Sequence, residues 1–174
     1  LHHDDAVIAR YPREMWAGSP LLFPIVSYNH VPGADHHYPW AGQNHPMPAH
    51  GFARKTPWKV TTQETDQVQL ELTDSDATRA VFPFAFRYRL TYRLQEGRLH
   101  WQQVIENLSP EPMPFGVGFH PYLPMPLSAG SKRSDCVIRI PRATRFNPIG
   151  RGNAYFSEPF SEQELPATVD TGST

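Results

Sequence analysis

The stretch "FAFRYRLTYRLQEGRLHWQQVIEN" (residues 84–107) decides the fold that this sequence predicts. In its first half, large apolar residues alternate with polar ones, mostly arginines, a two-residue period that is typical of a strand with one buried face. The letters "QEG" at 95–97 are a turn signal, and the alternation resumes after them. The stretch therefore predicts an antiparallel β-hairpin. The expected inner face comprises Phe86, Tyr88, Leu90, Tyr92, Leu94, Leu99, Trp101, Gln103 and Ile105.

The segment before the hairpin continues the same pattern. "WKVTTQE" (58–64) and "QVQLELT" (67–73) alternate or nearly so, with Thr65-Asp66 as the turn between them. Val68, Leu70 and Leu72 would share one face of the second strand. We therefore expect strands throughout residues 58–94.

Other parts of the chain carry less periodicity. Residues 23–57 hold many prolines, glycines and histidines, and their length predicts a functional loop. Residues 142–174 are mostly loop-like, whereas "DCVIRIP" (135–141) predicts another short strand. Together these segments predict an all-β protein: an antiparallel β-sandwich that forms a single domain over residues 1–174.

Composition narrows the class of protein. The 174 residues fit one domain, and 19 prolines nearly exclude long helices. The net charge is −1 and there is no basic stripe, so nucleic acid and anionic membranes are not expected as partners. The single cysteine excludes an internal disulfide. With no signal-peptide pattern and no apolar run of membrane-spanning length, we expect a cytoplasmic protein.

Two histidines occur in irregular, glycine-bearing stretches. His50 lies in "AHGFARKTPW" (49–58) and His120 in "PFGVGFHPYL" (114–123). Loops on a rigid sheet often carry sites, and histidine can act as acid, base or hydrogen-bond donor near neutral pH. For each histidine alone, a structural role is the commoner interpretation.

Aromatic residues offer a second kind of site. A ring can stack on the apolar C–H face of a sugar, although packing in the core claims most aromatics of any domain. Phe119 and Tyr122 are the better candidates because they flank His120. The remaining candidates are Trp40, Trp58 and Trp101, the last of which we expect in the core or on a sheet face.

Metal and nucleophilic chemistry find little support. His36-His37 and His45 share one loop, but HxH, HExxH and CxxC spacings are absent from the sequence. No GxSxG elbow, P-loop or dinucleotide-binding glycine pattern is present either. Cys136 lies in a strand-like run, which favours a small core residue over a thiolate. We therefore expect no metal site.

Four stretches resemble the aldose 1-epimerase (galactose mutarotase-like) family, and they occur in the same order. They are "GSPLLFPIV" (18–26), "AHGFARKTPW" (49–58), the hairpin with its preceding Pro-Phe-x-Phe segment (79–107), and "PMPFGVGFHPYL" (112–123). The last is the most specific, and the resemblance covers about residues 18–150. It implies a β-supersandwich, of which this chain would form part.

The resemblance also implies a reaction, the interconversion of the α and β anomers of a hexose by opening and closing its ring. An acid protonates the ring oxygen and a base removes the proton of the C1 hydroxyl, so no cofactor is implied. By motif, His120 would be the acid and His50 would hold the ring oxygen by a hydrogen bond. The expected substrate contacts are Arg54, Asn29, Tyr122 and Phe119.

The sequence departs from the family pattern in its last part. The family's base is a glutamate much later in the chain, and the Glu158-Pro159 pair of "SEPF" (157–160) follows His120 too closely to be its equivalent. We therefore expect a domain that is incomplete at its C-terminus, as a homodimer, a strand-swapped form or part of a longer polypeptide. Two alternatives remain open: a non-catalytic carbohydrate-binding protein on the same scaffold, and a metal-dependent β-barrel enzyme.

Overall fold

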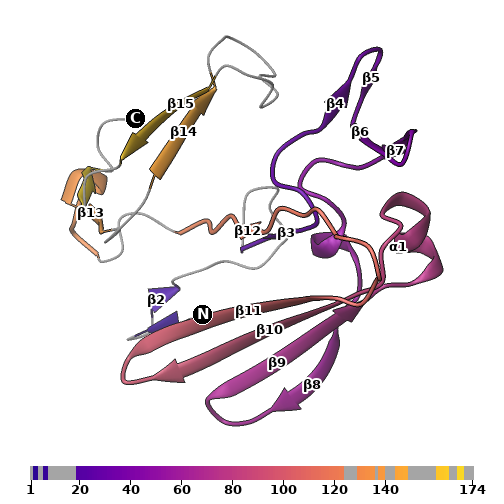
Figure 1. Cartoon of the computed structure of the whole chain (residues 1–174). Coiled ribbons are helices and arrows are strands. Elements are labelled where there is room, and N and C mark those ends of the chain that lie inside the picture. The colour runs from indigo at the N-terminus through magenta and orange to yellow at the C-terminus, as the bar shows by residue number, and fades with distance from the viewer. Residues whose placement is uncertain are drawn as a thin grey trace. The chain divides into compact units, whose positions relative to one another are not determined.

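The computed structural model (Figure 1) describes residues 2–3, 6–7, 19–123, 129–135, 137–139, 144–148, 160–164 and 168–170. The contacts divide the chain into two compact units. The first unit is Leu21–Gly118, and the second joins Leu1–Pro20 with Phe119–Thr174. The single domain expected over 1–174 stays a prediction.

The centre of the first unit is a four-stranded antiparallel sheet in the order β11-β10-β9-β8 (Figure 1). Its strands are β8 (Lys59–Gln63), β9 (Gln67–Thr73), β10 (Phe86–Gln95) and β11 (Arg98–Asn107). Gln95 pairs with Arg98, so only Glu96 and Gly97 form the turn, and both have positive φ (52° and 70°). Such two-residue turns match the twist of the strands they join, and the predicted hairpin is confirmed.

The predicted inner face of the hairpin is buried in its middle, although Leu99 of that face is 39% exposed. Phe86, Tyr88 and Leu90 are fully buried on β10, and Leu72 of β9 is 3% exposed. Leu94 continues the same alternation but is 54% exposed, because the core ends before the turn of the hairpin is reached. The alternation therefore predicted which side each residue lies on, whereas the extent of the core depends on what packs against that side.

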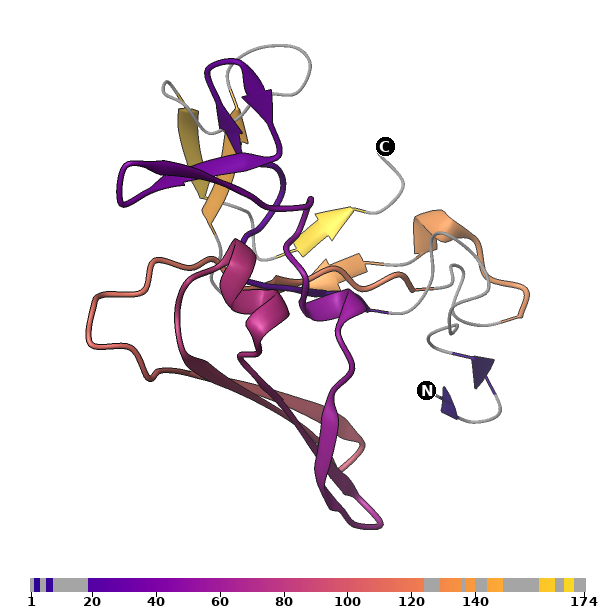
Figure 2. The same ribbon diagram turned by 90° about the vertical axis from the view of Figure 1, so that its right-hand side faces the viewer.

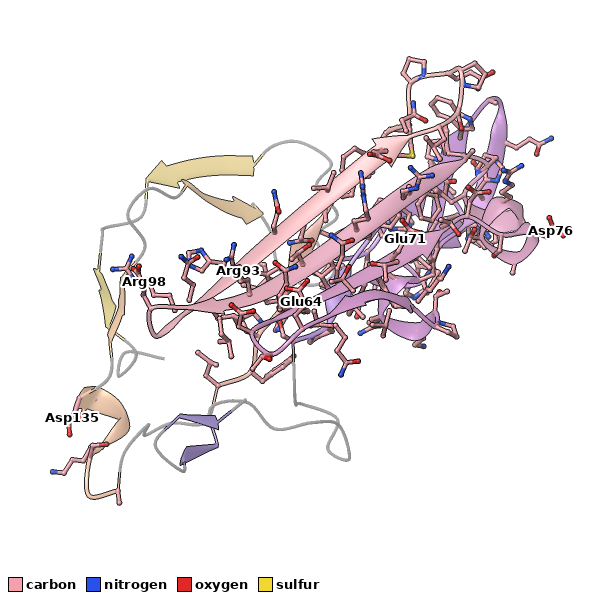
Figure 3. The ribbon with its side chains drawn as sticks, turned by 90° about the horizontal axis from the view of Figure 1, so that it is seen from below. Glu64, Glu71, Asp76, Arg93, Arg98 and Asp135 are labelled. Carbon is pink, nitrogen blue, oxygen red and sulfur yellow. The ribbon has the colours of Figure 1, made fainter. Side chains whose placement is uncertain are left out.

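The opposite face of the sheet is polar. Arg87 Nη1 lies 3.1 Å from Glu106 Oε2, and its Nε lies 3.6 Å from Glu71 Oε2. Arg89 also pairs with Glu106. Figure 3 shows Glu71 and Arg93 on the neighbouring strands β9 and β10. These pairs are partly exposed, so they keep this face soluble and add little to stability.

The core of the first unit is built around the Phe23 ring, which is fully buried. Its centroid lies 5.1 Å from those of Phe86 and Tyr88, and 5.9–6.0 Å from those of Phe82 and Phe52. Edge-to-face pairs at these distances are favourable beyond the area that they bury. Phe23 is the middle residue of Leu22-Phe23-Pro24, which we call the Leu-Phe-Pro segment. This segment therefore packs directly against the buried face of the sheet.

One helix, α1 (Asp76–Val81), interrupts the segment that we expected to be all strand. Ser75 Oγ accepts a hydrogen bond from the Thr78 N–H, and the Ser75 N–H donates to Thr78 Oγ1. This reciprocal cap satisfies two N–H groups that a short helix would leave unpaired. The prediction of strands throughout 58–94 was therefore wrong here. Figures 1 and 2 show α1 at the end of the sheet where β9 finishes and β10 begins.

The long segment 23–57 is more ordered than a loop. It contains two hairpins and a 3₁₀ turn, and it follows β3 (Leu21–Leu22). The elements are β4 (His30–Val31) with β5 (Ala34–Asp35), β6 (His37–Trp40) with β7 (Gln43–Pro46), and η1 (Ala53–Lys55). Strands this short show no readable period, which is why the sequence predicted a loop. Both hairpins lie beyond the α1 end of the sheet, away from the β10–β11 turn (Figures 1 and 2).

The second unit contains short strands and one 3₁₀ turn among its described residues, and the chain enters it through β12 (Gly118–Phe119). Its elements are β1 (His2–His3) with β2 (Ala6–Val7), η2 (Arg133–Asp135), β13 (Val137–Arg139) with β16 (Thr168–Asp170), and β14 (Thr144–Pro148) with β15 (Phe160–Glu164). The strand expected within 135–141 is confirmed. The loop expected over 142–174 is wrong for β14–β16, whose pairing partners are too distant for a local pattern to reveal.

The chain is thus all-β with antiparallel sheets, as the sequence predicted. Among the described residues, no helix has the length and the apolar character needed to cross a membrane.

Candidate functional site

His50 is held by a short ladder between two segments of the first unit. The His50 N–H donates to the Ser27 carbonyl (2.8 Å), and the His50 carbonyl accepts from the Phe23 N–H (3.2 Å). The next residue, Gly51, has φ +72°, and a Cβ built on it would lie 2.1 Å from the Phe23 carbonyl oxygen. Only glycine fits this position. The His-Gly pair therefore places the histidine directly against the Leu-Phe-Pro segment.

The imidazole of His50 is fixed as well as its backbone. The Ser27 N–H donates to His50 Nδ1 across 3.0 Å. A backbone N–H can only donate, so Nδ1 must be the lone-pair nitrogen, and the neutral ring carries its proton on Nε2. His50 also has φ +63°, a conformation that non-glycine residues adopt rarely and keep only where the surroundings fix it. The arrangement presents His50 as a hydrogen-bond donor through Nε2.

Arg54 and Trp58 order the loop that carries His50. Arg54 Nη2 donates to the Ala49 carbonyl (3.1 Å), and Trp58 Nε1 donates to the Ala53 carbonyl (2.9 Å). Both hydrogen bonds stay within the loop, so they order it. The side chain of Arg54 is exposed. Its expected contact with a substrate stays a prediction.

Asn29 lies in the strained turn region beside His50. Its carbonyl accepts a hydrogen bond from the His36 N–H (2.9 Å), and both Ser27 and His36 have positive φ (70° and 60°). The structure thus brings Ser27, Asn29, His36 and His50 into one hydrogen-bonded loop system. The sequence analysis missed Ser27, because its contribution is a backbone N–H and no residue pattern reveals one. A substrate contact by Asn29 stays a prediction.

His120 belongs to the second unit and is exposed. Its N–H donates to the Pro20 carbonyl (3.2 Å), and its ring stacks on that of Tyr122 with centroids 4.8 Å apart and an angle of 29° between the planes. Phe119 is 52% exposed. The structure therefore brings His120 and Tyr122 together. That His120 and His50 serve one cleft stays a prediction, as do the substrate contacts of Phe119 and Tyr122.

The two glycines before His120 lie in ordinary van der Waals contact with residues of the first unit. The Gly116 N–H donates to the Pro24 carbonyl (2.7 Å), and a Cβ on Gly116 would lie 3.4 Å from the Val26 nitrogen. A Cβ on Gly118 would lie 3.6 Å from side-chain carbons of Leu22 and Val26. Gly116 therefore packs its backbone against the segment that also holds His50.

The clustered histidines do not converge on a metal position. Nδ1 of His30 lies 2.8 Å from Asp35 Oδ1, and Nδ1 of His37 lies 2.8 Å from the Asp35 carbonyl oxygen. The His45 ring stacks on Tyr38 instead. In the described part of the chain, no three His, Cys, Asp or Glu side chains could jointly hold a metal ion. Cys136 and Glu158 lie outside the described residues.

Three tyrosines of the first unit are structural. Burial raises the pKa of Tyr38 and of Tyr92 to about 12, and it raises the pKa of Tyr88 further, with a smaller contribution from Tyr92. The Tyr38 hydroxyl donates to the Val81 carbonyl (2.8 Å). These phenols stay protonated near neutral pH, so none of them can act there as a base.

Comparisons with known proteins find similar chains. The profile of the aldose 1-epimerase family matches residues 12–153, which is more than half of the chain. A galactose mutarotase related enzyme from Lactobacillus acidophilus is 28% identical with a TM-score of 0.77, over 97% of this chain and 56% of that one. A galactose mutarotase-like protein from Lactobacillus casei is 25% identical with a TM-score of 0.73, over the same shares of both chains.

A third solved structure, from Synechocystis sp. PCC 6803, has higher identity over a shorter match. It is 37% identical with a TM-score of 0.59, over 67% of this chain and 43% of that one. The chain thus spans about half the length of the solved structures that it matches.

Proposed function

The chain belongs to the aldose 1-epimerase family, and on that premise we propose that it takes part in mutarotation, the interconversion of the α and β anomers of a hexose. The reaction needs a proton delivered to the ring oxygen and another removed from the C1 hydroxyl. The C1–O5 bond then breaks, C1 becomes a carbonyl, and rotation about C1–C2 precedes closure on the other face. Proton transfers suffice for this chemistry, so the proposal includes no cofactor.

One observation carries the proposal: the hydrogen bond from the Ser27 N–H to His50 Nδ1 (3.0 Å). It leaves the proton of a neutral His50 on Nε2, the form required to hold a ring oxygen by donating to it. The strained backbone of His50 and the glycine behind it fix this donor before any substrate arrives. A donor fixed in advance stabilises developing negative charge without reorganisation during the reaction.

In this proposal His120 is the acid that protonates the ring oxygen. Its exposure and its stacking on Tyr122 support the role, because the ring is accessible and held by a neighbour. Arg54, Asn29, Phe119 and Tyr122 are proposed to contact the hydroxyl groups or the C–H face of the sugar. The base is not assigned, and Glu158 is the first carboxylate to test within this sequence.

Polarimetry tests the proposal. Freshly dissolved α-D-glucose or α-D-galactose is mixed with the protein, and the change of optical rotation is compared with the spontaneous rate. We expect an acceleration that the His120→Ala variant loses and that a control variant at an exposed position of the sheet, Leu94→Ala, retains. Equal rates with and without the protein would overturn the proposal.

A non-catalytic carbohydrate-binding protein is the second candidate. It is favoured because the Glu-Pro pair of this sequence, Glu158-Pro159, follows His120 too closely to match the family's base. Calorimetric titration with the same sugars separates the two candidates, since a binder gives heat of binding without faster mutarotation. The homodimer expected from the sequence stays a prediction that light scattering can test.

A further inference from the structure

Tyr28 stands between two fixed points of the backbone. Ser27 before it exchanges two hydrogen bonds with His50, through its N–H (3.0 Å) and its carbonyl (2.8 Å). Asn29 after it accepts a hydrogen bond from the His36 N–H (2.9 Å). Ser27 and His36 both have positive φ, which is retained only where the surrounding contacts fix it. The side chain of Tyr28 is therefore presented from a backbone that is held on both sides.

The Tyr28 ring lies against two imidazoles. Its centroid is 5.3 Å from that of His36, with an angle of 54° between the planes, and 6.4 Å from that of His50, with an angle of 44°. These contacts restrict the ring without covering it, since Tyr28 remains 47% exposed. An accessible aromatic ring thus lies beside an imidazole whose neutral form carries its proton on Nε2.

This exposure sets Tyr28 apart from other tyrosines of the same unit. The hydroxyl groups of Tyr38 and Tyr88 donate to the Val81 carbonyl and to Gln103, so those tyrosines combine packing with an internal hydrogen bond. Within the described residues, the Tyr28 hydroxyl has no hydrogen-bond partner, and its ring contacts are the two imidazoles. Packing in the core therefore does not account for a large aromatic residue at this position.

We propose that Tyr28 is a substrate-contacting residue: its ring is the platform on which the apolar C–H face of an aldopyranose lies while His50 donates to the sugar. The proposal deepens the proposed function and rests on it. A pyranose turns C–H groups toward one face and hydroxyl groups toward its rim, so it matches an aromatic face flanked by a polar donor. The phenol ring adds contact area at little cost in entropy, because its neighbours already restrict it.

Kinetics on matched variants test this role. KM and kcat for mutarotation are measured with D-glucose and D-galactose for the unaltered protein and for Tyr28→Ala, Tyr28→Phe and Leu94→Ala. Leu94 is the control because it is comparably exposed and lies beside the β10–β11 turn. We expect Tyr28→Ala to raise KM about tenfold with kcat nearly unchanged, whereas Tyr28→Phe retains most of the affinity. Circular dichroism checks that each variant is folded.

The remaining outcomes separate the two proposals. If Tyr28→Ala behaves like Leu94→Ala, the platform is overturned and the proposed function stands. A fall in kcat with an unchanged KM would show that Tyr28 acts through His50, which also overturns the platform. If the unaltered protein binds these sugars without turnover, the same tenfold change is expected in Kd. If it neither binds nor converts them, both proposals fail.

Discussion

The carbonyl oxygen of Phe23 occupies the place where a side chain on residue 51 would begin, 2.1 Å from an ideal Cβ. Phe23 is the centre of the aromatic core, and residue 51 follows the histidine of the candidate site. Core and site are therefore joined through a single glycine. Changes at this glycine should disturb both.

Gly51→Ala should lower the free energy of unfolding by at least about 2 kcal/mol, because it adds a backbone clash to an unfavourable φ. Gly42→Ala is the matched control: Gly42 has nearly the same φ (+76° against +72°), but nothing lies within 4 Å of its Cβ position. The control should cost only about 1 kcal/mol, the penalty of the left-handed backbone alone. Urea unfolding of both variants measures the difference, and equal losses would contradict the close packing.

Two leucines on one face of β10 should differ sharply in their contribution to stability. Leu90 is fully buried, whereas Leu94 is 54% exposed four residues along the same strand. Leu90→Ala should cost about 2–5 kcal/mol by leaving a cavity, and Leu94→Ala less than about 1 kcal/mol. Thermal or urea unfolding is the measurement. A large loss of unfolding free energy for Leu94→Ala would mean that the Leu94 side chain is buried and would contradict the interpretation.

The cap of α1 should contribute measurably to stability. Ser75→Ala removes the acceptor for the Thr78 N–H and should cost about 1 kcal/mol. Ser75→Asp keeps a capping oxygen and should lose little. Comparing the denaturant midpoints of the two variants isolates the cap, and the interpretation fails if Asp is no better than Ala.

Alkaline pH should destabilise the first unit. Burial raises the pKa of Tyr92 to about 12 in the folded protein, against an ordinary value of 10.0. The folded state therefore holds this proton where the unfolded state releases it. The stabilisation is complete below pH 10 and is lost as pH rises toward 12. Tyr92→Phe should flatten the fall of the unfolding free energy across this window, as measured by urea unfolding at several pH values. A control substitution that removes no titratable group, Leu94→Ala, should leave the slope unchanged.

His50→Ala should reduce mutarotation by roughly a hundredfold to a thousandfold if His50 holds the ring oxygen, the loss typical of one fixed donor in an active site. His45→Ala is the control, since His45 is also half-buried but stacks on Tyr38. Polarimetry compares the two variants. Similar small losses in both would remove His50 from the mechanism.

The sequence predicted what strict local patterns encode. The period of two in β10 and the turn signal at 95–97 predicted the hairpin and the side of the sheet on which each residue lies, whereas the pairing of Gln95 with Arg98 was seen only in the structure. The pairing of His120 with Tyr122 was likewise within reach, because the two residues are neighbours in the chain. Helix α1 was missed because its signal is a single pair, Ser75 and Thr78, inside a run of strands.

The hydrogen bonds that shape the site could not be predicted in the same way. Ser27 and His50 are 23 positions apart, and the donor between them is a backbone N–H that any residue except proline would supply. Their meeting depends on the fold that brings the two segments together. The exposure of Tyr28 has the same origin, since burial follows from what packs against a residue and not from its identity.

Two hydrogen bonds between Ser27 and His50 close the excursion, residues 28–49, at its base. Residues added or removed at the Gly33 or Gly42 turns would lengthen or shorten the two small hairpins. The hydrogen bonds between Ser27 and His50 should stay in place, because closing a longer loop adds little entropic cost. The rest of the excursion is not freely exchangeable, because Met47 lies in the core and Tyr38 and Trp40 pack against it. Changes of length are therefore expected to be tolerated at these turns, where they leave the hydrogen bonds to His50 in place.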